Sequence, residues 1–293
     1  MLDFKEIKIE DYKYFKSSYL FEQEFSCENT FLNLLVWQEA YNNMFAIKDN
    51  ILFVKSGKGK NQTFFLPFGK DFDKGMELIQ EHSDTENPNF WVQDGPRFER
   101  FKENYAKQYK ITEVRKNFDY IYLQSDLAQL SGKKYHSKRN HINAFSKLYD
   151  WEYRNIDQSN ISDVKVCCEK WYNENLDKAD FTMGYERKGI YKLLDNFSAL
   201  NLLGGAIYIN GEVVAFTLGT PINQDCFDIA IEKALSEYSS AYTLINREFA
   251  KNCLENYKYI NREDDLGLEG LRKSKLSYNP DFLLKKYIAT AEE

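Results

Sequence analysis

The chain has 293 residues, 43% of them hydrophobic and 16% aromatic, with 39 lysines and arginines against 45 acidic residues. This length is enough for two domains of ordinary size, each with its own apolar core. The net charge of −6 disfavours a protein that binds nucleic acid over its whole surface, but it leaves room for a local basic patch. No segment reaches the ~20 apolar residues of a membrane-spanning helix, and the first residues lack a signal-peptide pattern. We expect a cytoplasmic protein.

The cysteines and histidines predict no metal centre. Five cysteines are an odd number and show no Cys-x-x-Cys spacing, so they indicate reduced, mostly buried thiols. Only three histidines are present, which leaves no pattern typical of a zinc site or a histidine-based triad.

The first half of the chain predicts alternating strands and helices. An alternating segment at 4–9 indicates a first strand, and Asp11 is placed to cap a helix that continues to about Phe21. The elements expected after these are a helix from Thr30, a hairpin that turns at Asp49-Asn50, a strand at 63–69, a helix at 71–84, a strand at 89–94, a helix at 96–105 and paired strands within 110–123.

The second half predicts the same order. Asn210-Gly211 between two apolar runs is a strong hairpin signal. The expected elements are a strand at 151–156, helices at 162–176 and 185–200, a hairpin at 204–220, a strand at 226–234, a helix at 239–257 and a strand at 257–261. Because the order repeats, we interpret the chain as a duplicated α/β unit with domains at 1–125 and 126–293, joined through a connecting helix within 125–149.

A charged block after the last of these strands is the strongest candidate site. Gly267 and Gly270 separate a run of acids from a run of bases at a strand-to-helix junction, where side chains can enter a crevice. The block contains residue types that could act as a general base and others that could bind an anion. The candidates are Asn261, Glu263, Asp264, Asp265, Arg272, Lys273 and Lys275. The alternative is a solvated turn with mutual salt bridges, each of which contributes little.

Two further segments carry candidate residues. The connecting helix is basic between residues 131 and 149, so one face of it could bind phosphate groups, or it could be an exposed helix that pairs with acids elsewhere. On the strand at 226–234, strict alternation would place Asp228 and Glu232 together on the face opposite Ile229 and Ile231. A carboxylate there could act as a base or could simply face solvent.

These blocks resemble a known family. The segment NREDDLGLEGLRKSKLSYNP (261–280) and the segment KKYHSKRNHINAF (133–145) resemble the two marked segments of the family named for the C-terminal domain of phosphatidylglycerol lysyltransferase. The resemblance implies two tandem acetyltransferase-like (GNAT) domains with mixed central sheets. It also implies transfer of an aminoacyl group from tRNA to a lipid headgroup, with Lys138, Arg139 and Asn140 at positions of functional basic and polar residues.

One departure from the usual GNAT pattern bears on the acyl donor. Enzymes that use acetyl-coenzyme A carry a glycine-rich turn before the helix that follows this strand, where backbone N–H groups hold the pyrophosphate. Residues 235–246 of this chain contain no glycine. The absence of this turn disfavours acetyl-coenzyme A as the acyl donor and favours aminoacyl-tRNA.

We therefore expect an acyltransferase that moves an aminoacyl or acyl group to an amine or hydroxyl acceptor, with no required cofactor and no metal. The acceptor is a small molecule, a peptide or a lipid headgroup, the last with the protein peripheral to the membrane. The predicted catalytic residues are Glu232, Asp264 and Asp265. The predicted substrate-binding residues are Lys138, Arg139, Asn140, Asn261, Arg272, Lys273 and Lys275. The alternatives are an acyl-coenzyme-A-dependent N-acetyltransferase and a non-catalytic module that binds tRNA or a headgroup.

Overall fold

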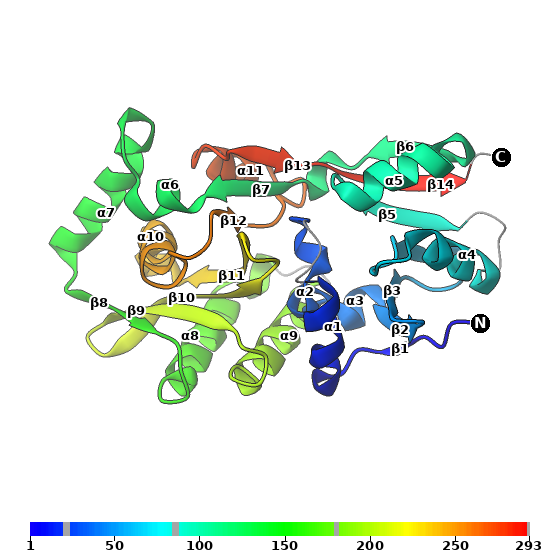
Figure 1. Ribbon diagram of the computed structural model, residues 1–293. Coiled ribbons are helices and arrows are strands. Elements are labelled where there is room, and N and C mark those ends of the chain that lie inside the picture. The colour runs from blue at the N-terminus through cyan, green and yellow to red at the C-terminus, as the bar shows by residue number, and fades with distance from the viewer. Residues whose placement is uncertain (20–23, 84–87, 179–181, 292–293) are drawn as a thin grey trace.

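The computed structural model describes residues 1–19, 24–83, 88–178 and 182–291. Within these residues the strands form two mixed sheets of seven strands each, which lie side by side with helices packed around them (Figure 1). The predicted α/β class is therefore confirmed. The two sheets share one strand plan, which agrees with the expectation of two tandem GNAT-like units. No helix in the described part of the chain combines the length and the apolar content needed to cross a bilayer.

The first sheet is built mainly from the first half of the chain. In spatial order its strands are β1 (Lys5–Glu6), β2 (Met44–Lys48), β3 (Ile51–Ser56), β4 (Thr63–Phe65), β5 (Asn89–Gln93), β14 (Lys286–Ala291) and β6 (Tyr109–Glu113). The helices of this half are α1 (Tyr12–Tyr19), α2 (Phe31–Val36), α3 (Gln38–Tyr41), α4 (Phe72–His82) and α5 (Pro96–Tyr105).

The second sheet follows the same plan. In the equivalent spatial order its strands are β8 (Trp151–Asn155), β9 (Leu203–Ile209), β10 (Glu212–Pro221), β11 (Cys226–Ala234), β12 (Tyr259–Asn261), β7 (Asp119–Leu123) and β13 (Phe282–Leu284). Its helices are α8 (Ile161–Glu174), α9 (Met183–Asp195), α10 (Ala241–Cys253) and α11 (Glu269–Leu276), while α6 (Gln124–Gln129) and α7 (His136–Leu148) connect the two halves.

Most predicted elements are present, with shifted bounds. The first strand is shorter than expected, because only Lys5–Glu6 pairs with β2. The expected helix from Thr30 divides at Trp37 into α2 and α3, and the Thr30 hydroxyl caps α2 by accepting the Asn33 N–H at 3.1 Å. The end of the helix expected to reach Phe21 lies outside the described residues.

The two sheets exchange one strand each. Strand β7 leaves the first unit and lies between β12 and β13 of the second sheet, while β14 returns from the second unit to lie between β5 and β6 of the first sheet. Figure 1 shows these strands running along the upper edge of the molecule from one sheet to the other. The predicted domain boundary between residues 125 and 126 stays a prediction, but the sheets do not follow it.

The units also share an apolar core. A cluster of buried residues joins α2 and β3 of the first unit to α8, α9 and β10 of the second, and it includes Leu35, Leu193 and Phe216. Helix α9 approaches α2 closely at Gly189, where a Cβ atom would lie 2.8 Å from the Val36 Cα. Burial of this shared apolar surface stabilises the two units together.

A β-bulge in β11 overturns the predicted alternation. The register between β10 and β11 passes from Leu218–Ile231 to Gly219–Ile229 and skips Ala230, so one extra residue lies in β11. As a result Ile229 and Ile231 pack in different apolar clusters. Asp228 and Glu232 therefore do not share a face, contrary to the expectation from strict alternation.

The exchanged strand β14 should be essential for the first sheet. Ala289 is fully buried between β5 and β6, so Ala289→Asp would place a carboxylate in the apolar cluster of that sheet. We expect the free energy of unfolding to fall by about 3 kcal/mol or more, measured by urea denaturation. Thr290→Asp, on the neighbouring half-exposed side chain, is the matched control and should cost less than about 1 kcal/mol. Equal losses in the two variants would contradict the assignment.

Candidate active site

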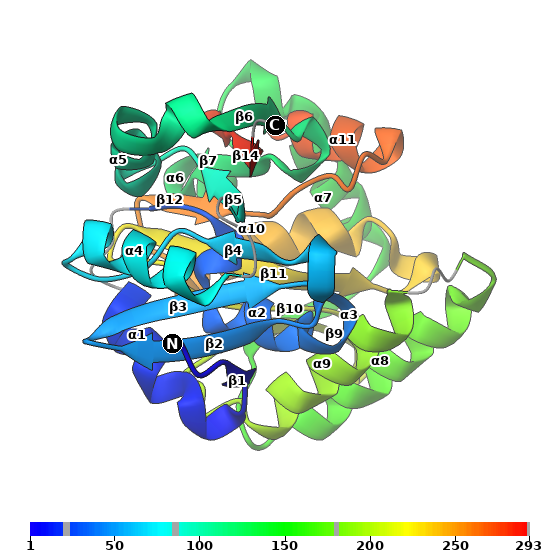
Figure 2. The same ribbon diagram turned by 90° about the vertical axis from the view of Figure 1, so that its right-hand side faces the viewer.

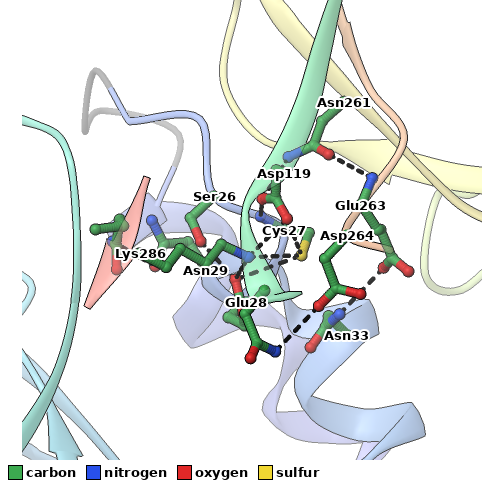
Figure 3. Close-up of polar contacts among 12 residues, drawn as sticks. Ser26, Cys27, Glu28, Asn29, Asn33, Asp119, Asn261, Glu263, Asp264 and Lys286 are labelled. Carbon is green, nitrogen blue, oxygen red and sulfur yellow. Dashed lines mark hydrogen bonds and ion pairs between the residues drawn. The ribbon is translucent and has the colours of Figure 1, made fainter. Parts of the chain in front are cut away.

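Polar residues from both units meet where the exchanged strands begin. Asp119 is the first residue of β7, Lys286 is the first residue of β14, and both side chains are fully buried. Figure 3 shows them against the short helical turn η2 (Cys27–Asn29) of the first unit and the segment that follows β12 in the second. This cluster lies beside the point where β11 and β12, a parallel pair over only three residues, separate.

Lys286 and Asp119 form a buried ion pair at the centre of this cluster. The Lys286 Nζ lies 2.6 Å from the Asp119 Oδ1, contacts the Glu28 carboxylate and lies 3.5 Å from the Cys27 Sγ. Burial alone would lower the pKa of Lys286, but the surrounding acids, Asp119 foremost, raise it well above its usual range. The lysine is therefore a fixed positive charge.

The same three acceptors have the spacing of a metal site. Single ligand atoms of Cys27, Glu28 and Asp119 lie within 4.8 Å of one another. The Lys286 ammonium contacts all three, so a cation already satisfies them. Burial also raises the pKa of the Cys27 thiol, which disfavours the thiolate that a metal needs.

Asn261 connects this ion pair to the charged block. Its Nδ2 donates to the Asp119 Oδ2 at 2.8 Å, and its Oδ1 accepts the backbone N–H of Glu263 at 2.6 Å (Figure 3). Glu263 has φ 54°, and its carboxyl accepts a hydrogen bond of 3.1 Å from Asn33 of α2. Burial and neighbouring acids raise the pKa of Glu263 to about 8. At neutral pH this carboxyl is therefore mostly protonated.

Asp264 has a different environment from its neighbour. Its two oxygens accept the Leu266 N–H at 3.0 Å and the Asn117 Nδ2 at 3.1 Å. Burial raises its pKa to about 6, so most of the carboxyl is ionised at neutral pH. Lys275 fixes the backbone of residues 262–264, because its buried Nζ donates to the carbonyls of Arg262 and Asp264. Burial lowers the pKa of Lys275.

Asp228 is the buried acid without a partner. Its side chain is fully buried, it pairs in register with Asn261, and neither carboxyl oxygen has a hydrogen-bond partner among the described residues. Burial, followed by the charges of Glu263 and Asp119, raises the pKa of Asp228 well above its usual value. An unpartnered buried carboxyl is costly, so this position fits a group that binds a proton or a ligand.

Asp265 has a structural role. Its buried carboxylate accepts hydrogen bonds from the Tyr120 hydroxyl at 2.6 Å, the Arg272 Nε at 2.8 Å and the Arg115 Nη1 at 3.1 Å. Burial would raise its pKa, but the bonds from Arg272 and Tyr120 hold the pKa well below its usual value. With its oxygens occupied, Asp265 fits the role of holding α11 against β7 better than that of a base.

Glu232 belongs to a second cluster on the opposite face of β11. Its carboxylate lies 2.8 Å from the Arg262 Nη2 and accepts the Asn246 Nδ2 at 3.1 Å. The Arg262 guanidinium and the Lys138 Nζ lie 4.7 and 3.7 Å from the centre of the Tyr278 ring. Burial, and then Arg262, lower the pKa of Lys138 to about 8. The Arg262 Nη1 is buried without a partner in the described structure, so this cluster can accept an anion.

The remaining predicted residues lie outside these clusters. Arg139 donates to the backbone carbonyls of Leu130 and Gly132, so it braces the turn before α7. Asn140 is exposed and contacts His136, while Lys273 is exposed and pairs with Glu269 at 2.8 Å. Their predicted roles in substrate binding stay predictions.

Sequence reasoning missed the contribution of the first unit. All of its candidate residues lie between 138 and 275, yet Cys27, Glu28 and Asp119 of the first half form the centre of the cluster together with Lys286. Asp119 and Lys286 each sit at the start of a strand, a position that offers no signal until strand exchange is known. Asp228 and Glu263 are among the carboxylates that the sequence indicates, but the sequence does not reveal their burial.

Comparison with known proteins identifies the family. Residues 21–290 match the family described as "Phosphatidylglycerol lysyltransferase, C-terminal". The chain belongs to this family. The match covers both units, and with the fold it supports an acyltransferase-like function related to that of lysylphosphatidylglycerol synthetases.

Solved structures and a curated relative extend the comparison. A conserved protein of unknown function from Bacteroides thetaiotaomicron is 38% identical, covers 100% of both chains and has a TM-score of 0.91. L-PGS from Bacillus licheniformis is 14% identical, with 92% of this chain and 93% of that chain covered and a TM-score of 0.60. FemX is 8% identical, with 99% and 97% covered and a TM-score of 0.61. The last two likenesses show the fold alone.

An uncharacterised protein of Mycoplasmoides gallisepticum is 26% identical over 175 residues, which is 58% of this chain. The match spans about half, 55%, of that relative's length.

Removing only the positive charge of Lys286 should destabilise the protein more than removing the charges of both Lys286 and Asp119. Lys286→Met leaves the buried Asp119 and Glu28 without their cation, and we expect a loss of about 3 to 5 kcal/mol in unfolding free energy. The double variant Lys286→Met/Asp119→Asn removes one of the stranded charges and should recover part of that loss. Urea denaturation of both variants measures the difference. An equal or larger loss in the double variant would exclude the ion pair as the stabilising contact.

The raised pKa of Glu263 predicts a pH dependence of stability. Its folded pKa of about 8 exceeds the ordinary value of 4.5. The stabilisation of the folded state by the protonated Glu263 is therefore fully present below about pH 4.5, and it is lost as the pH rises through about 8. Glu263→Gln removes this loss. Between about pH 5 and pH 9, the stability of the variant relative to wild type should rise by about 2 kcal/mol or more. Thermal denaturation across this range measures it, with the exposed Glu269→Gln as control.

Proposed function

We propose that this protein transfers an aminoacyl group from aminoacyl-tRNA to an amine or hydroxyl acceptor. The observation that carries the proposal is the group of carboxyls with raised pKa values where β11 and β12 separate, namely Asp228, Glu263 and Asp264. Attack on an acyl ester requires a proton acceptor near neutral pH, and carboxyls tuned toward neutrality supply it. Membership of the family supports the same reaction class.

Asp264 is the best proton acceptor among the predicted catalytic residues. Its pKa of about 6 leaves it ionised at neutral pH, whereas Glu263 is mostly protonated and Glu232 is paired with Arg262. The acceptor oxygen or nitrogen forms a bond to the ester carbonyl carbon as its proton passes to Asp264. The bond between that carbon and the donor's ribose oxygen then breaks, and the ribose oxygen takes the proton.

The unpartnered carboxyl of Asp228 fits recognition of an ammonium group. Together with Glu263 it provides hydrogen-bond acceptors for a primary amine, on the donor's amino acid or on the acceptor. An incoming ammonium would stabilise the ionised forms of both acids, because an opposite charge lowers the pKa of a nearby carboxyl.

The second cluster supports binding of the donor's phosphates. Lys138 and Arg262 converge on the ring of Tyr278, and the Arg262 Nη1 is free to donate. The turn before α10, at residues 235–240, has no glycine, which disfavours the extended phosphate cradle of an acetyl-coenzyme A enzyme. We therefore rank aminoacyl-tRNA above acyl-coenzyme A as the donor.

We place the protein in the cytoplasm, and on the membrane surface when the acceptor is a lipid headgroup. A small molecule or a peptide is the alternative acceptor. None of these acceptors requires a metal in the proposed reaction, since the carboxyl cluster supplies the proton transfer.

A transfer assay tests the proposal. Purified protein is incubated with radiolabelled aminoacyl-tRNA and with anionic lipid vesicles or soluble amines, and products are separated from tRNA. Asp264→Asn should lower the transfer rate about 100-fold or more, because a general base contributes roughly 10²–10⁴-fold. In the wild type the rate should rise with pH through about 6, where the pKa of Asp264 lies, and this rise should be absent in the variant. Asp195→Asn, the same change at an exposed carboxylate of α9 that pairs with Lys165, is the matched control.

Other outcomes would replace the proposal. Transfer from acetyl-coenzyme A but not from aminoacyl-tRNA would assign the chain to acyl-coenzyme-A-dependent N-acetyltransferases. Salt-dependent tRNA binding without any transfer would indicate a non-catalytic binding module. Full activity in Asp264→Asn would move the base to another carboxyl.

A further inference from the structure

Three leucines of the charged block point into solvent. Leu266, Leu268 and Leu276 expose 60%, 58% and 44% of their surface, although their neighbours Asp265 and Lys275 are buried. All three lie on α11 or on the turn just before it, and Figure 2 shows this helix at the rim of the molecule. We call the segment Leu266–Leu276 the leucine tip. Single exposed leucines are ordinary, but three exposed leucines within eleven residues offer apolar area for a partner.

The turn at the start of the leucine tip favours a different residue. The Leu268 N–H bonds to the Asp265 carbonyl at 2.8 Å, and the two central residues, Leu266 and Gly267, have φ of 51° and 79°. Two positive φ angles are those of a type I′ turn, in which Asn or Gly is strongly preferred at the first central position. A leucine there costs backbone energy, and its exposed side chain recovers none of it by packing.

The leucine tip and its surroundings carry an excess of positive charge. Five cations lie on it or beside it against three acids, in a chain whose net charge is −6. The Lys116 side chain is exposed and its Cβ lies 3.5 Å from the position of a Cβ at Gly267. The cations are Arg115, Lys116, Arg272, Lys273 and the buried Lys275, and the acids are Asp264, Asp265 and Glu269.

We propose that the leucine tip docks on an anionic phospholipid surface, with the leucines entering the boundary between headgroups and acyl chains. Exposed leucines rimmed by lysine and arginine are the pattern of an interfacial membrane contact, in which apolar burial and attraction to anionic lipid act together. The inference rests on the peripheral location proposed above but not on the transfer reaction.

The chemistry of the tip favours a membrane over other partners. Surfaces that bind single-stranded nucleic acid present aromatic rings for stacking, and the tip presents leucines. A stable contact with a second copy would bury roughly 800 Å² per partner, which is large for a single turn and an eight-residue helix. A docked tip would also place Asp264, which accepts the Leu266 N–H, next to the headgroup layer.

Vesicle sedimentation tests the proposal on the full chain. Wild-type protein is mixed with vesicles of phosphatidylcholine, with and without phosphatidylglycerol, and binding is measured in the pellet. Binding should require the anionic lipid and weaken with salt. Leu266→Asn/Leu268→Asn should weaken binding by about tenfold or more, because it removes the inserted apolar groups. Lys116→Gln should weaken it by about fivefold, the share of one cation near the surface.

Two controls separate binding from folding. Leu266→Asn places a favoured residue in the turn, so its melting temperature should equal or exceed that of the wild type while its vesicle affinity falls. Leu148→Asn removes an exposed leucine of α7, 76% exposed, and should leave vesicle binding unchanged. Transfer to a soluble amine, tested in parallel, distinguishes loss of docking from loss of chemistry.

Three results would overturn the proposal. One is absence of binding to anionic vesicles, another is equal binding by wild type and Leu266→Asn/Leu268→Asn, and the third is a concentration-dependent dimer that the leucine substitutions abolish. The last result would assign the tip to a contact between two copies of the chain.

Discussion

The buried ion pair between Lys286 and Asp119 is the contact on which the rest of the structure depends. Each residue begins a strand that its own unit gives to the other unit's sheet, so the pair fixes the place where the two exchanged strands cross. A buried charge without its partner costs several kcal/mol, which makes this crossing selective for one arrangement of the strands. The loop that carries Cys27 and Glu28 is bound to the same point.

The ion pair also determines the protonation of the site. The acids near it outnumber the buried lysines, so they cannot all ionise at low cost in a poorly hydrated environment. Asp228 and Glu263 accordingly have raised pKa values, and burial raises the pKa of Asp119 as well, although it contacts Lys286. Glu28, which shares that lysine, has a lowered pKa despite its burial. Asp264 lies between these extremes, with a pKa of about 6. A graded set of carboxyls of this kind suits proton transfer near neutral pH.

The sequence predicted the periodic parts of the fold and the charged block, because both are local. Alternation and turn residues located most strands and helices, and the repeated order revealed the duplication. The sequence could not predict the exchange of β7 and β14, since strand pairing between distant segments leaves no local pattern. For the same reason Asp119 and Lys286 were missed. Asp228 and Glu232 were wrongly expected to share a face, because the bulge at Ala230 is invisible to strict alternation.

The duplicated units differ in how completely they satisfy their buried polar groups at equivalent positions. In the first unit Arg97, which follows β5, donates to the carbonyl of Leu66, which follows β4, and to the buried carboxylate of Glu24. The gap between these parallel strands is therefore closed by a satisfied ion pair. In the second unit Arg262 follows β12 and reaches Glu232 on β11, but its Nη1 and both oxygens of Asp228 lack partners among the described residues. Unpaired buried groups cost stability unless a ligand satisfies them, so this difference between the units supports the site proposed in the second one.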